Sequence, residues 1–313
     1  IANGDWSSDV CSSDLMNPLL FFFELLVNFI LWPIYFVVVC VGYVYDLFAC
    51  KKVPTPRKIV ITGASSGMGA CSAIEYAETG VTLVLMGRNA ERLAATKKAC
   101  EDKGATVVTF ECDLREKEKV EAFLKEEDDK APVDLIIAAA GVMIPQCGKN
   151  QDIDETTREL YSINIYGTMN TILPLLSRMQ QRRSGQIAIF SSGAGFCAEP
   201  MNPIYSATKV ALTAYGESLR YIMRDYNVFV SVVDPGAVRT PMTLVPYLQG
   251  MESSLASPEG MAKTLRAGLK RDFMHIGYTT AQHWAIVTLL GDMPYTAKDY
   301  ILRALIPVFK ASK

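Results

Sequence analysis

The stretch Thr62-Gly63-Ala64-Ser65-Ser66-Gly67-Met68-Gly69 decides the fold of this chain. It lies between Ile59-Val60-Ile61, an apolar run that predicts a buried parallel strand, and residues 70–77, whose apolar spacing predicts a helix. Strand, glycine turn and helix in this order form the context in which such a run binds a dinucleotide. The glycines let the backbone approach a pyrophosphate, and the helix N-terminus offers N–H donors and a positive dipole end. An ordinary tight turn between strand and helix is the alternative.

The charge at the end of the next predicted strand indicates which dinucleotide binds. Proteins that bind NAD usually place an acidic residue there, on the ribose 2′-hydroxyl. Here the strand Thr82–Met86 ends in Gly87-Arg88-Asn89, so no carboxylate repels a 2′-phosphate and Arg88 offers a planar fork to bind one. The sequence therefore favours NADP(H) over NAD(H). The alternative is that Arg88 only pairs with Glu91 on the following helix.

One tyrosine has the setting of a proton donor. Of the 14 tyrosines, only Tyr205 is followed four residues later by a lysine, Lys209. Residues four apart stack on one face of a helix, so the ammonium can lie beside the phenol. Because a nearby cation favours the charged form of a group whose free pKa is about 10, the pair suits proton transfer to a carbonyl oxygen near neutral pH.

A serine at the end of another predicted strand is the expected partner of this tyrosine. Ser191-Ser192 follows the strand-like stretch Gln186–Phe190, and ligands of open α/β sheets bind at the carboxyl ends of strands. A serine there can also simply cap a turn. With Tyr205 thirteen residues further on, we favour a Ser192 hydroxyl that faces the same pocket.

In order and spacing, these motifs resemble the short-chain dehydrogenase/reductase family over residues 56–280. Three further elements match: Asp113 after the third predicted strand, Asn164 in Ile163-Asn164-Ile165-Tyr166-Gly167, and Asp234-Pro235-Gly236. The resemblance implies an α/β fold, a doubly wound parallel sheet of the Rossmann type. It implies that Ser192 orients the substrate oxygen and Tyr205 transfers the proton. It also implies that Lys209 holds the nicotinamide ribose and lowers the tyrosine pKa, and that Asn164 supports a proton-relay water.

The predicted cofactor site joins the glycine turn to residues that the resemblance adds. Its members are Gly63, Ser65, Ser66, Gly67, Met68, Gly69, Arg88, Asp113, Gly141, Tyr205, Lys209, Pro235 and Gly236. One departure is visible, because the family usually has Asn-Asn-Ala-Gly after the fourth strand and this chain has Ala138-Ala139-Ala140-Gly141. The glycine next to the cofactor is kept, but the amides that tie neighbouring backbone together are lost. We expect local rigidity and cofactor affinity to suffer, and the chemistry to be unaffected.

Composition and charge limit the domain organisation, the partners and the compartment that the protein can have. The alternation of strands and helices from Lys58 to Gly277 predicts a single doubly wound sheet, and a net charge of −2 gives no reason to expect a nucleic-acid partner. The charge-rich run Glu116–Lys130 is expected to be a solvated helix with a buried stripe. The eight cysteines form no Cys-x-x-Cys pair, which suits a reducing compartment. We predict no metal site, and ordinary packing or surface roles for His275 and His283.

The N-terminal region predicts a membrane anchor over residues 16–50. Leu25–Tyr45 carries no formal charge, and about 20 apolar residues cross a bilayer. Basic residues follow at once, so the positive-inside bias places the catalytic domain in the cytosol, at the endoplasmic reticulum in a eukaryote. The alternatives are a hairpin on the membrane surface and a soluble enzyme with an apolar helix. Residues 1–15 look like a non-native leader before Met16.

The region after Gly236 predicts the kind of substrate. Thr240–Leu248, followed by Met251, is an apolar, methionine-bearing segment that suits a lipophilic substrate, although it can equally just cover the core. Residues 281–313 predict a helical extension that lies on the membrane, roofs the pocket or packs between subunits. A homo-oligomer through the helices near 155–180 and 205–224 is an expectation from the resemblance alone.

The sequence thus predicts a membrane-anchored NADPH-dependent reductase that converts the ketone or aldehyde of a lipophilic substrate into an alcohol. Among family members, lipid-carbonyl reductases such as 3-ketodihydrosphingosine reductases are the expected neighbours, and no residue selects one of them. The alternative from another class is a non-catalytic NADP(H)-binding membrane scaffold or redox sensor. The lost amides at Ala138 and Ala139 favour that alternative, whereas the complete set of Ser192, Tyr205, Lys209 and Asn164 speaks against it.

Overall fold

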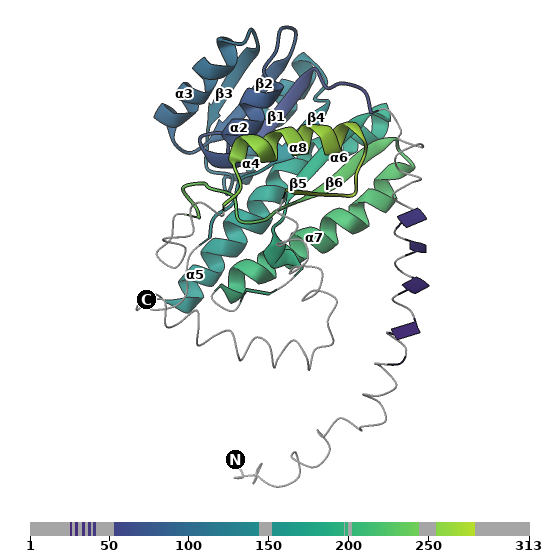
Figure 1. Cartoon of the computed structure of the whole chain (residues 1–313). Helices are drawn as coiled ribbons and strands as arrows, with labels where there is room; N and C mark the ends of the chain where they lie inside the picture. Colours follow the sequence, from purple (N-terminus) through teal and green to yellow (C-terminus); the bar gives the residue numbers. More distant parts are fainter. Residues whose placement is uncertain are drawn as a thin grey trace, which may run out of the picture. The chain divides into compact units, whose positions relative to one another are not determined.

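The structure of the protein is a computed structural model, drawn in Figure 1. It describes residues 53–143, 152–196, 198–199, 202–243 and 255–278, together with residues 26, 29, 30, 33, 34, 37, 38, 40 and 41 of an N-terminal helix. The chain divides into two compact units, residues 1–51 and 52–313.

Within the described residues, the second unit is built on one sheet of seven parallel strands. The strands are β1 (Lys58–Thr62), β2 (Thr82–Gly87), β3 (Thr106–Glu111), β4 (Leu135–Ala138), β5 (Gly185–Phe190), β6 (Val228–Pro235) and β7 (His275–Tyr278). Their order across the sheet is β3-β2-β1-β4-β5-β6-β7. This order confirms the predicted Rossmann-type α/β fold, and the strands predicted at Ile59–Ile61, Thr82–Met86 and Gln186–Phe190 are β1, β2 and β5.

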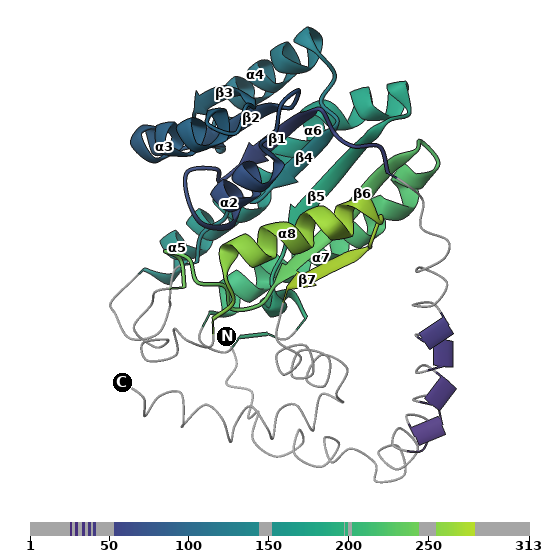
Figure 2. The ribbon, with the colours of Figure 1, turned by 45° about the horizontal axis from the view of Figure 1, so that its top comes forward.

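Helices cover both faces of the sheet (Figure 2). They are α2 (Gly67–Tyr76), α3 (Ala90–Glu101), α4 (Lys117–Lys130), α5 (Ile153–Leu160), α6 (Gly167–Arg182), α7 (Pro203–Arg224) and α8 (Pro258–Lys270). A π-helical segment, η1 (Tyr161–Tyr166), joins α5 to α6, and a short 3₁₀ helix, η2 (Gly193–Gly195), follows β5. The charge-rich helix predicted over Glu116–Lys130 is α4, and its buried stripe includes Val120 and Leu124.

Two hydrophobic cores lie on opposite faces of the sheet. The first packs α2, α3 and α8 against Ile59 and Ile61 of β1. The second packs α4, α6 and α7 against Val60 of the same strand. Because both faces are covered, the central strands are apolar along their whole length, as expected of a parallel sheet.

The position of the site follows from the strand order. The chain moves outward from β1 to β2 and β3, returns to β4 on the other side of β1, and then continues to β7. Ligands of such sheets bind outside the carboxyl ends of the strands, where the order reverses. In this chain the reversal lies between β1 and β4, so it brings the turn that starts at Gly63 next to the segment that starts at Ala139.

The N-terminal unit carries described helical residues between positions 26 and 41. Large apolar side chains among them are exposed: Leu26, Phe29, Ile30, Ile34, Val37, Val38 and Val41. Among the described residues, the structure contains no helix with the length and apolar character needed to cross a bilayer. Much of the predicted span Leu25–Tyr45 lies outside the described residues, as do the predicted leader at 1–15 and the predicted extension at 281–313.

Candidate active site

The glycine turn after β1 brings backbone segments closer together than side chains would permit. Gly63 has a φ of +68°, in the left-handed region, and a Cβ built on it would lie 2.9 Å from the Ala140 Cα. A Cβ on Gly69 would lie 2.3 Å from the Gly63 carbonyl oxygen. Both positions therefore require glycine, and the turn fits tightly between α2 and the end of β4.

The N-terminus of α2 is open toward the turn. The helix begins at Gly67, has no acidic residue in its first turn, and its Ser66 N-cap makes no side-chain capping hydrogen bond. The first N–H groups of a helix have no partner within the helix, and together with the dipole they favour an anion. This end of α2 is therefore suited to a phosphate group, as the sequence predicts.

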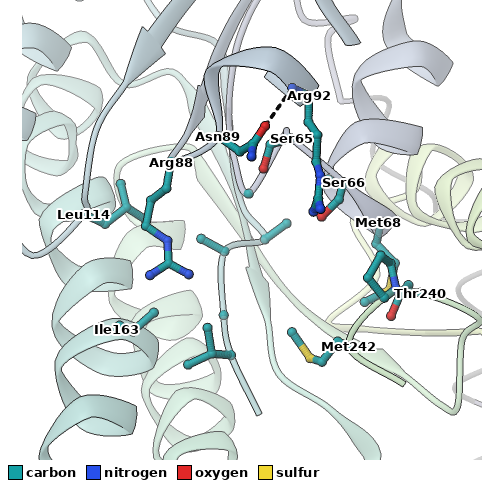
Figure 3. Close-up of a pocket in the computed structure, with 18 of the residues that line it drawn as sticks. Ser65, Ser66, Met68, Arg88, Asn89, Arg92, Leu114, Ile163, Thr240 and Met242 are labelled. Carbon is teal, nitrogen blue, oxygen red and sulfur yellow. Dashed lines mark hydrogen bonds between the residues drawn. The ribbon is translucent and has the colours of Figure 1, made fainter. Parts of the chain in front are cut away.

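A cavity of about 410 Å³ lies at this turn (Figure 3). Nine residues of the predicted cofactor site line it: Gly63, Ser65, Ser66, Gly67, Met68, Gly69, Arg88, Asp113 and Gly141. Further lining residues are Asn89, Arg92, Leu114, Ala139, Ala140, Val142, Ile163, Thr240, Pro241 and Met242. The wall thus combines the ends of β1 to β4 with the start of the segment that follows β6. Four predicted cofactor residues, Tyr205, Lys209, Pro235 and Gly236, are outside this lining.

Two arginines reach the cavity from the end of β2, and sequence reasoning found only one of them. Arg88 follows the strand, and Arg92 lies one helical turn later, where its N–H donates to the Asn89 side chain at 2.8 Å (Figure 3). Neither guanidinium forms an ion pair with a described carboxylate, so Glu91 does not engage Arg88 as the alternative required. The spacing of four residues was the signal that could have revealed Arg92.

Asp113 lies at the end of β3 with its carboxylate already engaged. The Arg115 Nε donates to both carboxylate oxygens, at 3.0 and 2.9 Å. These hydrogen bonds, with a smaller contribution from the charge of Arg88, hold the pKa of Asp113 below its usual value. Asp113 therefore lines the cavity as an anion, and its charge is directed at Arg115.

Tyr205 and Lys209 lie on one face of α7, as the sequence predicts. The Lys209 ammonium is 5.5 Å from the centre of the Tyr205 ring and donates a hydrogen bond of 2.9 Å to the carbonyl of Phe190, the last residue of β5. Only 4% of Lys209 is exposed, and no described carboxylate lies within ion-pair distance. Burial lowers the pKa of Lys209 to about 8, although Asp234 opposes this effect.

Gly141 connects this pair to the cavity wall. A Cβ on Gly141 would lie 3.6 Å from the Lys209 Nζ and 3.3 Å from the Asn164 Oδ1. The glycine that forms part of the lining thus separates the cavity from the lysine by a single backbone layer. Lys209 and Asn164 are consequently adjacent to the cavity even though they are not part of its lining.

The side-chain amide of Asn164 connects the segment after β4 to α7. It lies in the π-helical segment η1, where its side chain accepts from the Val142 N–H at 2.8 Å and donates to the Val142 carbonyl at 3.0 Å. It also donates to the Thr208 hydroxyl on α7 at 3.1 Å, and Thr208 donates to the Tyr205 carbonyl at 2.7 Å. Asn164 therefore ties the backbone at Val142 to α7, and the expected loss of rigidity at Ala138 and Ala139 stays a prediction.

Ser192 is held at the start of η2, where it caps the turn. Its hydroxyl oxygen accepts from the Ala194 N–H at 3.2 Å. The preceding residue, Ser191, is buried and binds Thr213 at 2.6 Å and the Lys209 carbonyl at 3.0 Å, which fastens this turn to α7. Both readings of Ser192 thus remain compatible, because a hydroxyl that accepts one hydrogen bond can still donate another.

Sequence comparison adds to this geometry. Residues 57–245 match the family described as short chain dehydrogenase. The chain belongs to that family. Bovine (Bos taurus) 3-ketodihydrosphingosine reductase is 32% identical over 247 residues, which cover 72% of this chain and 74% of that enzyme. As a member of the family, the protein is an oxidoreductase that acts on a carbonyl or alcohol group with a nicotinamide cofactor.

Solved structures of short-chain dehydrogenases share the fold. One from Sphingobium yanoikuyae in complex with NADPH has a TM-score of 0.64 and 25% sequence identity, covering 76% of this chain and 96% of that one. One from Mycobacterium paratuberculosis bound to NAD has a TM-score of 0.65 and 24% identity, covering 75% of this chain and all (100%) of that one. These likenesses show that the chain shares their fold.

The residues at the cavity fit such a cofactor. The close approach at Gly63 and Gly69 leaves no side chain between the backbone and a bound phosphate, and the start of α2 offers unpaired N–H groups without an opposing carboxylate. The thiols of the described core are unsuited to an additional role in catalysis, because burial raises the pKa of Cys100 to about 11 and that of Cys112 to about 12.

The motif Asp234-Pro235-Gly236 closes the end of β6, where Asp234 meets a residue that sequence reasoning assigned to ordinary packing. The His275 Nδ1 lies 2.7 Å from an Asp234 carboxylate oxygen, and its Nε2 lies 3.1 Å from Glu217 on α7. The prediction of an ordinary packing or surface role for His275 did not anticipate these two contacts and stays a prediction. Its place between two carboxylates depends on the pairing of β6 with β7, which brings together residues 41 positions apart in the chain.

Proposed function

We propose that this short-chain dehydrogenase uses NADPH to reduce the carbonyl of a lipophilic substrate, with Tyr205 as the proton donor. The observation that carries the proposal is the state of Lys209. Its ammonium is buried and has no described carboxylate within ion-pair distance. It lies 5.5 Å from the centre of the Tyr205 ring and next to the Gly141 segment of the cavity wall. Since an unpaired buried cation is costly, a role in the reaction gives the best account of its position.

The chemistry divides between cofactor and protein. When bound, the nicotinamide supplies a hydride to the carbonyl carbon. As the C=O π pair moves to oxygen, Tyr205 donates its phenolic proton to that oxygen, and Ser192 donates a hydrogen bond to it. Lys209 places a positive charge beside the resulting tyrosinate, and Asn164 fixes Val142 and Thr208 around the pair.

Two unpaired arginines support the choice of NADPH. Arg88 and Arg92 both line the cavity at the end of β2, where a bound dinucleotide places the 2′-position of its adenosine ribose. A planar guanidinium binds a phosphate through parallel N–H bonds, and neither of these is occupied by a described carboxylate. We infer that both arginines bind the 2′-phosphate.

A lipophilic substrate is the third part of the proposal. Pro241 and Met242 bring apolar surface to the cavity from the segment that follows β6. The 3-ketodihydrosphingosine reductases, to which the chain is similar, act on a lipid ketone by name. We therefore propose a long-chain ketone or aldehyde as the substrate class.

Attachment of the enzyme to a membrane is consistent with a lipophilic substrate. We propose that the apolar stretch Leu25–Tyr45 attaches the chain to a membrane as a single-pass anchor with the catalytic unit in the cytosol. The exposed apolar side chains at described positions from Leu26 to Val41 support attachment. Alkaline carbonate washing of membranes tests it: retention in the pellet is expected, and release into the supernatant would contradict the anchor.

Turnover tests the function as a whole. Full-length protein in detergent is incubated with NADPH and, in turn, 3-ketodihydrosphingosine, a long-chain 3-oxoacyl-CoA and a steroid ketone, while NADPH absorbance is followed. We expect oxidation of NADPH with at least one of them, and a loss of about 10²-fold or more in Tyr205→Phe with NADPH binding retained. Near-native turnover by Tyr205→Phe would contradict the proposal. Binding of NADPH without turnover of any ketone would favour the non-catalytic scaffold.

A further inference from the structure

A chain of charged groups begins at Lys209. The Lys209 ammonium donates to the Phe190 carbonyl, and Phe190 pairs with Val233, the residue before Asp234 in β6. Asp234 is the last residue but one of β6, His275 begins β7, and Glu217 lies on α7 two turns beyond Lys209. The imidazole bridges the two carboxylates, with its Nδ1 2.7 Å from Asp234 and its Nε2 3.1 Å from Glu217. The ring of Phe196 packs edge-on against the imidazole at 5.4 Å. The family mechanism described above uses none of these three charged residues.

The contacts define the charge of the imidazole. A neutral imidazole has one N–H donor and one acceptor, so it can donate to only one carboxylate. Because both nitrogens of His275 face carboxylate oxygens, the protonated ring, which donates through both nitrogens, fits these contacts best. Hydrogen bonds and charge from Asp234 and Glu217 accordingly raise the pKa of His275 despite its partial burial.

Among these charged groups, Asp234 is the one whose ionisation depends most on its neighbours. The residue is 9% exposed, and one carboxylate oxygen, Oδ1, has no hydrogen-bond partner among the described residues. Burial raises the pKa of Asp234, whereas His275 and Lys209 oppose the rise. The influence is mutual, since Asp234 is the charge that raises the pKa of Lys209 against the effect of burial.

We propose that Asp234 is the counter-charge of Lys209 and that His275, clamped by Glu217, keeps Asp234 ionised. The four side chains then carry two positive and two negative charges, which balance. Asp234 and His275 are positioning residues, because they act on the reaction only through Lys209. The proposal rests on the proposed function, in which Lys209 assists Tyr205.

The expected behaviour follows from the charges that face each group. Lys209 is faced by Tyr205 on its own helix and by Asp234 from β6, and Asp234 is faced by Lys209, His275 and Glu217. Without the Asp234 charge, the pKa of Lys209 falls further below its present value. Without the His275 cation, the pKa of Asp234 rises further, so Asp234 loses its charge more readily and the pKa of Lys209 falls in the same way.

Kinetics as a function of pH test the proposal in full-length protein with NADPH and the ketone that is turned over fastest. In Asp234→Asn, the alkaline limb of kcat should move to lower pH by about one unit, and in His275→Gln it should move in the same direction. In the double variant, His275→Gln should add nothing, because its only route to Lys209 has been removed. An additional shift in the double variant, or a shift to higher pH in His275→Gln, would overturn the proposal.

A matched control separates charge coupling from loss of stability. Asp272 pairs with Arg220 at 2.6 Å in an equally buried position that precedes β7, away from Lys209. Asp272→Asn should lower the stability to a similar degree without moving the pH profile of kcat. If it moves that profile as Asp234→Asn does, the effect is structural and the proposal fails.

A readout without turnover keeps this test apart from that of the function. In cofactor-free full-length protein with ¹³Cε-labelled lysine, NMR titration follows Lys209, assigned by its absence in Lys209→Met. The pKa of Lys209 should be lower in Asp234→Asn and in His275→Gln than in wild type, and unchanged in Asp272→Asn. An unchanged value in Asp234→Asn would overturn the coupling, whether or not any ketone is reduced.

Discussion

Two buried lysines of this unit show how the scaffold differs from the site. Lys58 starts β1 and is 5% exposed, and Lys209 on α7 is 4% exposed. The Lys58 ammonium forms an ion pair of 3.0 Å with Glu127 and also donates to its backbone carbonyl. In the described part of the chain, the Lys209 ammonium donates one hydrogen bond, to the Phe190 carbonyl, and has no carboxylate at ion-pair distance.

The two lysines differ because they lie at opposite ends of the parallel strands. Lys58 lies at the amino end of the sheet, where the chain needs only a stable fold and the buried charge is neutralised at once. Lys209 reaches the carboxyl end of β5, where ligands of such sheets bind. The partial loss of solvation there lowers the pKa of Lys209 to about 8, into the range in which proton transfer operates. A buried lysine without a contacting carboxylate therefore marks the site, and one in a direct ion pair marks the scaffold.

The largest expected effects come from replacing each lysine by methionine, because the two substitutions should change activity and stability in opposite ways. Lys209→Met should lower kcat by about 10²-fold or more, because Tyr205 loses its neighbouring cation. The same change should stabilise the cofactor-free protein by about 1–3 kcal/mol, since a desolvated ammonium is replaced by an apolar side chain. Chemical denaturation of the variant and kinetics at saturating NADPH measure the two effects.

Lys58→Met is the matched control and should behave in the opposite way. It leaves Glu127 buried with Lys130 as its remaining ion-pair partner, so stability should fall by about 2–4 kcal/mol. Activity per folded molecule should stay at the wild-type level. If both substitutions lower stability equally and only modestly affect kcat, the distinction between the two lysines is wrong.

The arginines extend the comparison to the cofactor. Arg220 is paired with Asp272 inside the fold, whereas Arg88 and Arg92 line the cavity without an ion pair to a described carboxylate. Arg88→Ala should weaken NADPH binding about 10- to 100-fold and leave NADH binding nearly unchanged, with a smaller effect of the same kind from Arg92→Ala. Titration of protein fluorescence with each dinucleotide measures this selectivity. Equal losses for NADPH and NADH would remove the assignment of the 2′-phosphate to these residues.

The smallest expected effect is a dependence of the free energy of unfolding on pH, caused by the lowered pKa of Lys209. The pKa of Lys209 in the folded protein is about 8, below its ordinary 10.5, so the unfolded chain binds more protons between these values. Stability of the cofactor-free protein should therefore rise with pH across this window, by up to about 1 kcal/mol per pH unit, and Lys209→Met should lack that rise. Below pH 8 the two proteins should differ by a constant amount. Parallel curves for both throughout would contradict the lowered pKa.

Local patterns were enough to predict the fold and much of the site. Alternating strands and helices indicated the sheet, because both faces of a parallel sheet are buried and its strands read as apolar runs. The glycine turn placed Gly63 and Gly69 correctly, since only glycine tolerates such close approach to backbone. The spacing of Tyr205 and Lys209 placed both on one helix face. Each of these features is encoded within a few consecutive residues.

The features that were missed depend on pairing between distant segments. His275 meets Asp234 only because β7 pairs with β6, and no spacing within the sequence encodes that contact. Asn164 holds the backbone of Val142 because η1 lies beside the segment that follows β4, although the two residues are 22 positions apart in the chain. The proposed anchor at Leu25–Tyr45 remains a prediction from hydropathy.

The pKa of the Lys209 ammonium is the measurement that tests the central claim most directly. It is obtained by NMR titration of full-length, cofactor-free protein labelled with ¹³Cε-lysine, with Lys209→Met to assign the signal. The unpaired, desolvated position predicts a value of about 8. A value near the ordinary 10.5 would show that this charge is neutralised like any other buried lysine, and would contradict the account of the site.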